Sequence, residues 1–392
     1  MKCIHKSAVV VLLALAAQTA SAQQQGVSKT EIVLGTTQDL SGPLAAYGKD
    51  QLNGMRLRVS EINEQGGVHG RKLRLMAEDH GYDPKRAVLT TQKLVNQDKI
   101  FMMVGSIGTP TNLAAMPVLF EKNIINFMPA SNAREMFDPP TKLKWAFAPS
   151  YFQASRVTIP ALVQEKKASK VCTLYQDDES GLEVVRGAEA GLKDIGVELA
   201  ERTTYKRGAT DFSSQVARLK SANCDFVIMG TVIRETVGTL LEMRKLNYSP
   251  TVIGGMAAYT ALIPKLGGKA MDGFYAAYFA PHPYLDDASP AVRFWANKYQ
   301  TAFGVEPSVL SVVGYAIADR LISGLQKTGP NLTTETFAKT MESLTIPEDI
   351  FGLPAMKFSS TLHVGTDRVN LAQIQDGRWK TIPIQPINNL AR

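Results

Sequence analysis

The sequence predicts an α/β protein built from two doubly wound lobes, each with a largely parallel sheet. Short apolar runs alternate with helical segments of ten or more residues, which is the pattern of parallel strands covered by helices on both faces. The alternation starts near Glu31, breaks at Asp138–Thr141 (DPPT) and restarts at Val171. A length of 392 residues also allows about two domains. We therefore expect two similar halves, with the binding site in the cleft between them.

The first half contains four predicted strands, separated by segments with helical periodicity. The helices between the first three strands are expected at Lys49–Glu64 and Ala87–Asn96. The strands are expected at Glu31–Gln38, Lys72–Glu78, Phe101–Val104 and Ile124–Met128.

The turns after the third and fourth strands carry small polar residues at predicted helix starts. Thr109 is predicted to cap a helix that has Pro110 at its first position, where a missing N–H costs nothing. Asn132 is predicted to cap a further helix. Two neighbouring helix starts with free backbone N–H groups form a pocket for an anion, and a carboxylate is the expected ligand.

The second half repeats the strand–helix pattern and is followed by two more helices and a hairpin. Its helices are expected at Gly181–Asp194, Asp211–Ala222 and Glu235–Leu246, and its strands at Val171–Asp177, Val197–Tyr205, Asp225–Gly230, Thr251–Gly254 and Gly273–Phe279. The amphipathic segments Ser289–Phe303 and Ser308–Thr328 are expected to pack back on the first lobe. Strands at Ala355–Ser359 and Val369–Gln375 come last, with a hairpin turn at Asp376-Gly377.

Residues 1–22 have the pattern of a cleavable secretory signal peptide. Lys2 and Lys6 precede the apolar run Ala8–Ala17, and Ala20-Ser21-Ala22 fits a small-residue cleavage site. We expect an exported protein whose mature chain starts near Gln23. No later stretch of the sequence is long and apolar enough for a membrane helix.

Two cysteines remain after this processing, Cys172 and Cys224, each at the edge of a predicted parallel strand. Export makes a disulfide chemically possible. Two buried free thiols are the alternative, and the sequence leaves both open.

Charge and motifs argue against several functional classes. The formal net charge of +7 includes Lys2 and Lys6, and basic and acidic residues are interspersed, which disfavours nucleic-acid binding. His69, His80, His282 and His363 are scattered, and no metal-ligand spacing, nucleophile elbow or phosphate-binding loop occurs. We therefore expect a monomeric binding protein without cofactor, metal or catalytic residues.

Several short words in the sequence, taken in order, resemble the leucine/isoleucine/valine-binding protein family. These words are Leu40–Gly48 (LSGPLAAYG), Ile62–Lys72 (INEQGGVHGRK), Tyr82–Ala87 (YDPKRA), Asp211–Leu219 (DFSSQVARL) and Asp225–Val227 (DFV). The family comprises type I periplasmic solute-binding proteins of ABC importers. The resemblance implies two lobes joined by a three-crossing hinge, closure over a solute, and delivery to a membrane permease. Lobe 1 would comprise residues 23–149 plus 281–356, and lobe 2 residues 150–280 plus 357–392.

The resemblance also implies which first-lobe residues contact the ligand. A hydroxyl at Thr109, the backbone at Ala130 and the side chain of Asn132 would hold a carboxylate, with Tyr47 at the edge of the cleft. All four positions suit N–H and O–H donors around an anion.

The second lobe departs from the pattern of amino-acid binders in this family. Met256 stands where those proteins have an acidic partner for the ammonium, and Ser180 and Val232 align with their cleft tyrosines. A buried ammonium without a carboxylate partner would carry a desolvation cost of several kcal/mol. Met256 and aromatic residues suit an apolar, flat ligand body; these aromatics are Tyr151, Phe152, Tyr259, Tyr275 and Tyr278.

We therefore expect a periplasmic protein that captures an aromatic acid of the benzoate or phenylpropenoate type. One alternative is an amino-acid binder in which Asp39 or Glu235 pairs with the ammonium. A second is a sensory module that presents its ligand to a receptor. Arg134 and Arg234 are expected to be solvated, although either could pair with a substrate carboxylate.

Overall fold

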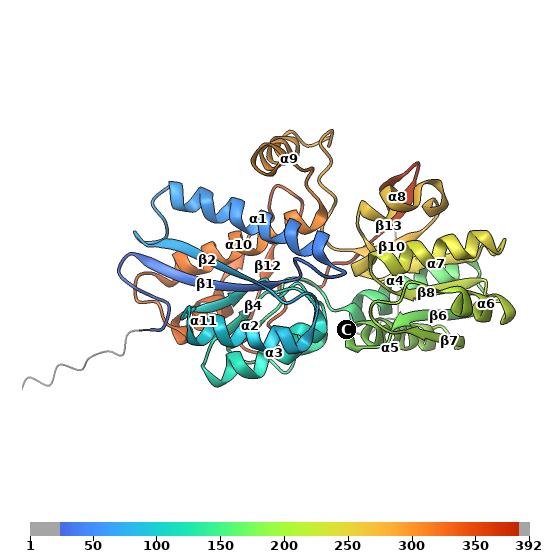
Figure 1. The fold of residues 1–392 in the computed structure, drawn as a ribbon, viewed down its shortest axis with the longest axis horizontal. Helices are drawn as coiled ribbons and strands as arrows, with labels where there is room; N and C mark the ends of the chain where they lie inside the picture. The colour runs from blue at the N-terminus through green and yellow to red at the C-terminus, as the bar shows by residue number, and fades with distance from the viewer. Residues whose placement is uncertain (1–23, 384–392) are drawn as a thin grey trace, which may run out of the picture.

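A computed structural model describes residues 24–383, so the predicted signal peptide lies outside the described residues. Two separate sheets form the centres of two lobes that lie side by side (Figure 1). The predicted α/β fold with two largely parallel sheets is confirmed.

The first sheet is fully parallel and has the order β2-β1-β3-β4-β5. Its strands are β1 (Glu31–Gln38), β2 (Lys72–Asp79), β3 (Met102–Val104), β4 (Ile125–Phe127) and β5 (Lys144–Trp145). The helices of this part are α1 (Ala45–Glu64), α2 (Pro84–Asn96), α3 (Thr109–Glu121), α9 (Pro290–Phe303), α10 (Val309–Thr328) and α11 (Thr334–Ser343). Strands β3 and β4 are buried throughout, which explains why they read as continuous apolar runs.

The second sheet has the order β14-β13-β10-β9-β8-β6-β7, with β13 and β14 antiparallel at one edge. Its strands are β6 (Val171–Gln176), β7 (Leu199–Tyr205), β8 (Phe226–Gly230), β9 (Thr251–Gly254), β10 (Tyr275–Tyr278), β13 (Asn370–Gln375) and β14 (Arg378–Ile382). The helices are α4 (Tyr151–Lys166), α5 (Glu179–Asp194), α6 (Ser213–Ser221), α7 (Ile233–Lys245) and α8 (Leu262–Gly267), with 3₁₀ turns η2 (Met256–Ala258) and η3 (Gly268–Met271).

Helix α10 packs along α1 on the first lobe, although more than 240 residues separate their starts (Figure 1). Glycines make this close crossing possible. A Cβ on Gly54 would lie 2.0 Å from the carbonyl oxygen of Ser311, and one on Gly314 would lie 2.0 Å from that of Gln51. The prediction that this helix packs back on the first lobe is therefore confirmed.

The chain passes between the two sheets three times: after β5, after β10 and before β13. The predicted return to lobe 2 at residue 357 is too early. The bridge of Val364 to Ala146, and the contacts of Phe358 and His363 with Trp145, hold residues up to Gly365 on the first lobe. The short strand β12 (Met356–Lys357) pairs with β11 (Thr345–Ile346) and not with the second sheet.

The predicted helix after Asn132 is wrong. Only the 3₁₀ turn η1 (Arg134–Met136) forms there, with Ala133 at its N-cap position. Pro139 and Pro140 follow closely, and a residue that precedes proline is disfavoured in the helical conformation.

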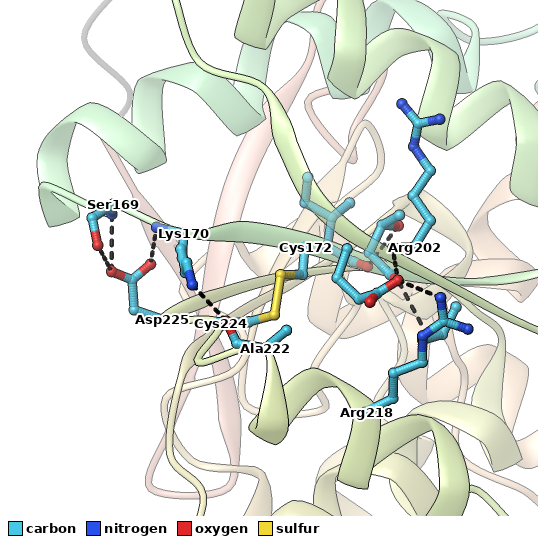
Figure 2. Close-up of a disulfide and its surroundings, with 12 residues drawn as sticks. Ser169, Lys170, Cys172, Arg202, Arg218, Ala222, Cys224 and Asp225 are labelled. Atoms are coloured by element: carbon cyan, nitrogen blue, oxygen red, sulfur yellow. Dashed lines mark hydrogen bonds and ion pairs between the residues drawn. A yellow bond between two sulfur atoms is a disulfide. The ribbon is translucent and has the colours of Figure 1, made fainter.

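Figure 2 shows that Cys172 and Cys224 form a disulfide, so the free-thiol alternative is wrong. Cys172 lies in β6, Cys224 lies just before the neighbouring strand β8, and the Cα atoms are 5.9 Å apart. Next to the disulfide, the Asp225 carboxylate accepts hydrogen bonds from the backbone N–H groups of Ser169 and Lys170. These bonds join the starts of two adjacent strands.

Candidate functional site

A cavity of about 110 Å³ lies between the two lobes. It is lined from the first lobe mainly by the segments that follow β3 and β4. From the second lobe it is lined by residues at or just after the ends of β6, β7, β8, β9 and β10. Ligands of doubly wound sheets bind at the carboxyl ends of parallel strands, so this cavity has the expected position. Helix α10 adds Val309, Leu310 and Val313 to the wall.

The two lobes touch each other around the cavity, which is the geometry of a closed form. The Tyr47 hydroxyl donates a hydrogen bond to the carbonyl oxygen of Ala257 across the cleft, at 2.7 Å. On the other side, Arg207 donates to the carbonyl oxygen of Tyr82 at 3.1 Å, and its guanidinium lies over the Tyr82 ring at 5.4 Å. Gln176 also approaches the Tyr82 hydroxyl, at 3.4 Å.

Eight of the nine predicted site residues line the cavity: Tyr47, Thr109, Ala130, Asn132, Tyr151, Ser180, Val232 and Met256. Phe152 does not. It follows Tyr151 in α4, and its ring lies under the guanidinium of Arg134 at 4.2 Å. Contact of the eight residues with a ligand remains a prediction.

Thr109 does not cap α3 as predicted, because Gly108 occupies the N-cap position with a φ of 95°. Thr109 is the first helical residue, and its hydroxyl forms a hydrogen bond with the Ser131 hydroxyl at 2.8 Å. The side chain therefore faces the next strand-to-helix turn instead of its own helix start.

The backbone groups of Ala130, which were predicted to contact the ligand, each form a hydrogen bond within the first lobe. The Ala130 N–H donates to the carbonyl oxygen of Ser106 at 2.9 Å, and its carbonyl accepts from the N–H of Gly108 at 3.1 Å. These bonds extend the pairing of β3 and β4 by one step. Ala130 thus contributes a small apolar side chain.

Tyr151 brings an oxygen atom to the turn formed by Thr109 and Asn132. Burial raises the pKa of Tyr151, while the nearby Asn132 backbone and Thr109 side chain oppose that rise. The amide of the Asn132 side chain donates to the carbonyl oxygen of Pro149 at 3.0 Å and does not cap a helix. The Tyr151 oxygen therefore lies near the Asn132 backbone and the Thr109 side chain.

The second-lobe wall opposite this turn is apolar. Met256 in η2 is buried, with its sulfur 3.9 Å from the side-chain amide of Asn132. Ser180 donates its hydroxyl proton to the Asp178 carboxylate at 2.6 Å, so that hydroxyl is committed within its own helix start. Val232 precedes α7 and provides no side-chain cap.

Neither carboxylate raised as an ammonium partner lies at the cavity surface. Asp39 accepts hydrogen bonds from the backbone N–H groups of Gly42 and Leu44 at 2.5 and 2.7 Å, and so holds the loop before α1. Glu235 is buried in the first turn of α7, and burial raises its pKa.

The two arginines have different surroundings. The Arg134 side chain is 40% exposed, so it is partly solvated as predicted, and it does not line the cavity. It forms a forked ion pair with Glu183 of α5, at 2.7 to 3.2 Å, and the Glu183 side chain is fully buried. Arg234 is exposed, as predicted.

Several lining residues were not predicted from the sequence. Three of them, Tyr205, Gln176 and Gly230, lie at or next to the last positions of predicted strands. They could have been predicted, because ligands of such sheets bind at the carboxyl ends of the strands. Of the other predicted aromatics, Tyr259 and Tyr278 line the cavity, whereas Tyr275 lies beneath Lys166 on the opposite face of the sheet. Nothing in the local sequence indicated that Val309, Leu310 and Val313 of α10 line the cavity.

A family profile of periplasmic binding proteins matches residues 31–378. The chain belongs to this family. A curated relative, a Leu/Ile/Val-binding protein homolog from Brucella abortus, is 26% identical over 327 residues, covering 80% of this chain and 82% of the relative.

Two solved structures share the fold. A fatty acid ABC transporter substrate-binding protein from Thermomonospora curvata has a TM-score of 0.84 at 21% identity and covers 94% of this chain and 95% of its own. An ABC transporter solute-binding protein from R. palustris in complex with benzoate has a TM-score of 0.80 at 18% identity, covering 90% and 96%.

The family is that of periplasmic binding proteins, and the solved structures share its fold. Within residues 24–383, no group of His, Cys, Asp and Glu side chains could hold a metal ion. The helices of that range are also too short or too polar to cross a membrane.

Proposed function

We propose that this protein captures a small aromatic carboxylate in the periplasm and delivers it to the permease of an ABC importer. The observation that carries this proposal is the asymmetry of the cavity. A turn with the Thr109 hydroxyl and the Asn132 amide lies on one side, and an apolar wall containing Met256 lies opposite it.

The turn suits one end of a carboxylate ligand. Thr109 is at the start of the 13-residue helix α3, where unpaired N–H groups and the helix dipole favour negative charge. The Thr109 hydroxyl forms a hydrogen bond with the Ser131 hydroxyl, and the Asn132 side-chain amide lies on the same side of the cavity. A ligand carboxylate would extend this arrangement, since charge-assisted hydrogen bonds are stronger than neutral ones.

An α-amino acid fits the cavity poorly, because its ammonium and carboxylate are attached to the same carbon atom. An ammonium partner would have to lie beside the carboxylate turn, and the group that faces Asn132 there is the thioether of Met256. An ammonium buried against a thioether would lose its hydration without gaining an ion pair.

The remaining walls suit a flat ring. Phe147 and Phe279 meet edge to face at 5.7 Å, and Tyr259 stacks on Tyr278 at 4.6 Å; all four line the cavity. The volume of about 110 Å³ is of the same order as a cavity of ~150 Å³ that holds benzene. A single ring fits such a space better than a long acyl chain.

Capture would proceed by hinge closure. The solute binds one lobe, and the second lobe moves over it because the solute makes additional contacts in the closed form. The similar structure in complex with benzoate supports the aromatic ligand. The Leu/Ile/Val-binding homolog and the fatty-acid transporter protein support two other candidates, a branched-chain amino acid and a fatty acid.

A thermal-shift and calorimetry panel tests the proposal. Benzoate, phenylpropenoate, octanoate, leucine and valine are compared on the same mature protein. A ligand at 100 times its Kd stabilises the folded state by about 2.7 kcal/mol, which gives a measurable shift of the midpoint. We expect benzoate or phenylpropenoate to give the largest shift. Strong stabilisation by leucine or valine, with none by the aromatic acids, would contradict the proposal.

A further inference from the structure

His80 is fully buried directly after the last residue of β2, behind the first-lobe wall of the cavity. The backbone N–H of Tyr82 donates to its Nδ1 at 3.0 Å, and its Nε2 lies 3.1 Å from the carbonyl oxygen of Ile107. Tyr82 and Ile107 both line the cavity, although they follow different strands, β2 and β3. The His80 ring therefore connects two turns of the cavity wall.

The two partners determine which ring nitrogen of His80 carries the proton. A backbone N–H can only donate, so Nδ1 has no hydrogen, and a carbonyl oxygen can only accept, so Nε2 has one. The ring is therefore neutral. A second proton would have to bind at Nδ1, where it would face the N–H of Tyr82, and that hydrogen bond would be lost.

The hydrogen bond from Tyr82 supports a backbone conformation that tyrosine rarely adopts. Gly81 and Tyr82 have φ values of 55° and 58°, in the left-handed region that suits the glycine and not the tyrosine. The Tyr82 ring also packs closely on Gly108, where a Cβ would lie 2.7 Å from the Tyr82 Cε2. Loss of the bond to His80 would therefore release the turn that places the Tyr82 ring in the cavity wall.

Tyr82 also meets the second lobe in the closed form. Its carbonyl oxygen accepts the hydrogen bond from Arg207, and its hydroxyl lies 3.4 Å from the side-chain amide of Gln176. The position of Tyr82 thus affects both the cavity wall and the closure of the lobes. A proton on His80 would disturb both.

The charged groups that act on His80 among the described residues are Asp39, Asp79 and Arg86. They come from three elements, because Asp39 follows β1, Asp79 ends β2 and Arg86 lies in α2. Burial lowers the pKa of His80 below the usual 6.5, and Arg86 adds to this effect. The hydrogen bond to Ile107 and the charges of Asp39 and Asp79 oppose it without reversing it. The ring is therefore neutral at pH 7, as its hydrogen bonds require.

We propose that His80 is a positioning residue that makes solute affinity depend on pH. In its neutral form, it holds the turns after β2 and β3 in the geometry that the solute and the second lobe require. When His80 takes up a proton, the turn at Tyr82 is released and the solute is bound more weakly. The proposal requires that the solute binds in this cavity, but it does not depend on which solute that is.

The test measures the Kd of benzoate and of leucine by titration calorimetry, from pH 8 down to the onset of acid unfolding. NMR of protein with ¹⁵N-labelled histidine gives the tautomer and the pKa of His80, with single-histidine substitutions assigning the signals. We expect the Nε2–H tautomer and a Kd that is constant above the pKa of His80. Below that pKa the Kd should rise by up to about tenfold for each pH unit, because binding then has to release one proton.

His80→Gln removes the titrating group, so its Kd should be higher than that of the wild type and should no longer follow this pKa. The same variant reports any titration of the solute's own carboxylate. His282→Gln is the matched control: burial also lowers the pKa of His282, but His282 does not line the cavity, and its ring packs on Tyr284. This control should keep the pH dependence of the Kd. If His80→Gln does not fold, the agreement of the two wild-type profiles still decides.

The outcomes separate this proposal from the proposed function. If leucine binds and benzoate does not, the proposed function fails, and the Kd of leucine tests His80. An Nδ1–H tautomer, a Kd that stays constant through the pKa of His80, or a His80 that takes up no proton before the protein unfolds overturns the role of His80. The proposed function then stands if benzoate binds. If neither solute binds, the tautomer still decides whether His80 holds the two turns.

Discussion

At the scale of single residues, Thr109 is the side chain on which the carboxylate turn most depends. Its hydroxyl faces Ser131 and the Tyr151 oxygen and caps no helix, so it can be removed without loss of a cap. We expect Thr109→Val to weaken binding of an aromatic carboxylate by about 1–3 kcal/mol. Titration calorimetry checks this, with Thr111→Val as the control, because Thr111 bonds only the carbonyls of its own turn. Equal affinities of the Thr109 variant and the wild type would remove Thr109 from the site.

We expect the stability of the folded protein to depend on pH through His282, which lies in the link after β10. Burial and then the charge of Arg378 lower the pKa of His282 to about 4, and its Nδ1 has no partner among the described residues. The unfolded chain takes up a proton near pH 6.5 while the folded protein does not, so stability is complete above pH 6.5 and falls toward pH 4. His282→Gln should flatten this fall by about 1–3 kcal/mol in urea titrations.

At the scale of elements, the crossing of α1 and α10 holds the last lining helix against the first lobe. Gly314 lets the two backbones meet, because a Cβ at that position would lie 2.0 Å from the Gln51 carbonyl oxygen. Gly314→Ala should force the helices apart and lower the free energy of unfolding by about 1–3 kcal/mol. It should also weaken ligand binding, since Val309, Leu310 and Val313 would move with α10. Gly329→Ala, at the end of the same helix, has open space around it but a φ of 84°; it should lower stability without changing affinity.

The elements that could be predicted from the sequence are those fixed by local patterns. The buried parallel strands were visible in the sequence as apolar runs. The Asp-Gly pair at 376–377 predicted the hairpin turn, where both residues have a positive φ. The roles of Thr109 and Asn132 could not be predicted, because they depend on the positive φ of Gly108 and on Pro149. Equally, the partner of Arg134 lies 49 residues away in the sequence. Such pairings are set by the packing of lobes and not by neighbours in the chain.

At the scale of the whole molecule, the cavity exists because two lobes close around it. Eight of the predicted site residues came from both lobes, so the sequence located the cleft well. It did not show which donors were already used, since that depends on contacts between strands, as for Ala130. Nor did it show the groups that hold the lobes together away from the ligand. Arg207 and Tyr82 are such a pair, joined by a hydrogen bond and by a ring contact.

The contact of Arg207 with Tyr82 should stabilise the closed form, because it links the two lobes and Arg207 itself does not line the cavity. We expect Arg207→Gln to speed ligand release several-fold, which corresponds to the loss of about 0.5–1.5 kcal/mol, with little effect on the association rate. Stopped-flow fluorescence measures both rates. Lys206→Gln is the matched control: it removes the same charge one residue away, where the lysine pairs with Asp177 of its own lobe. Equal release rates in the two variants would show that closure does not depend on this contact and that the ligand itself holds the lobes together.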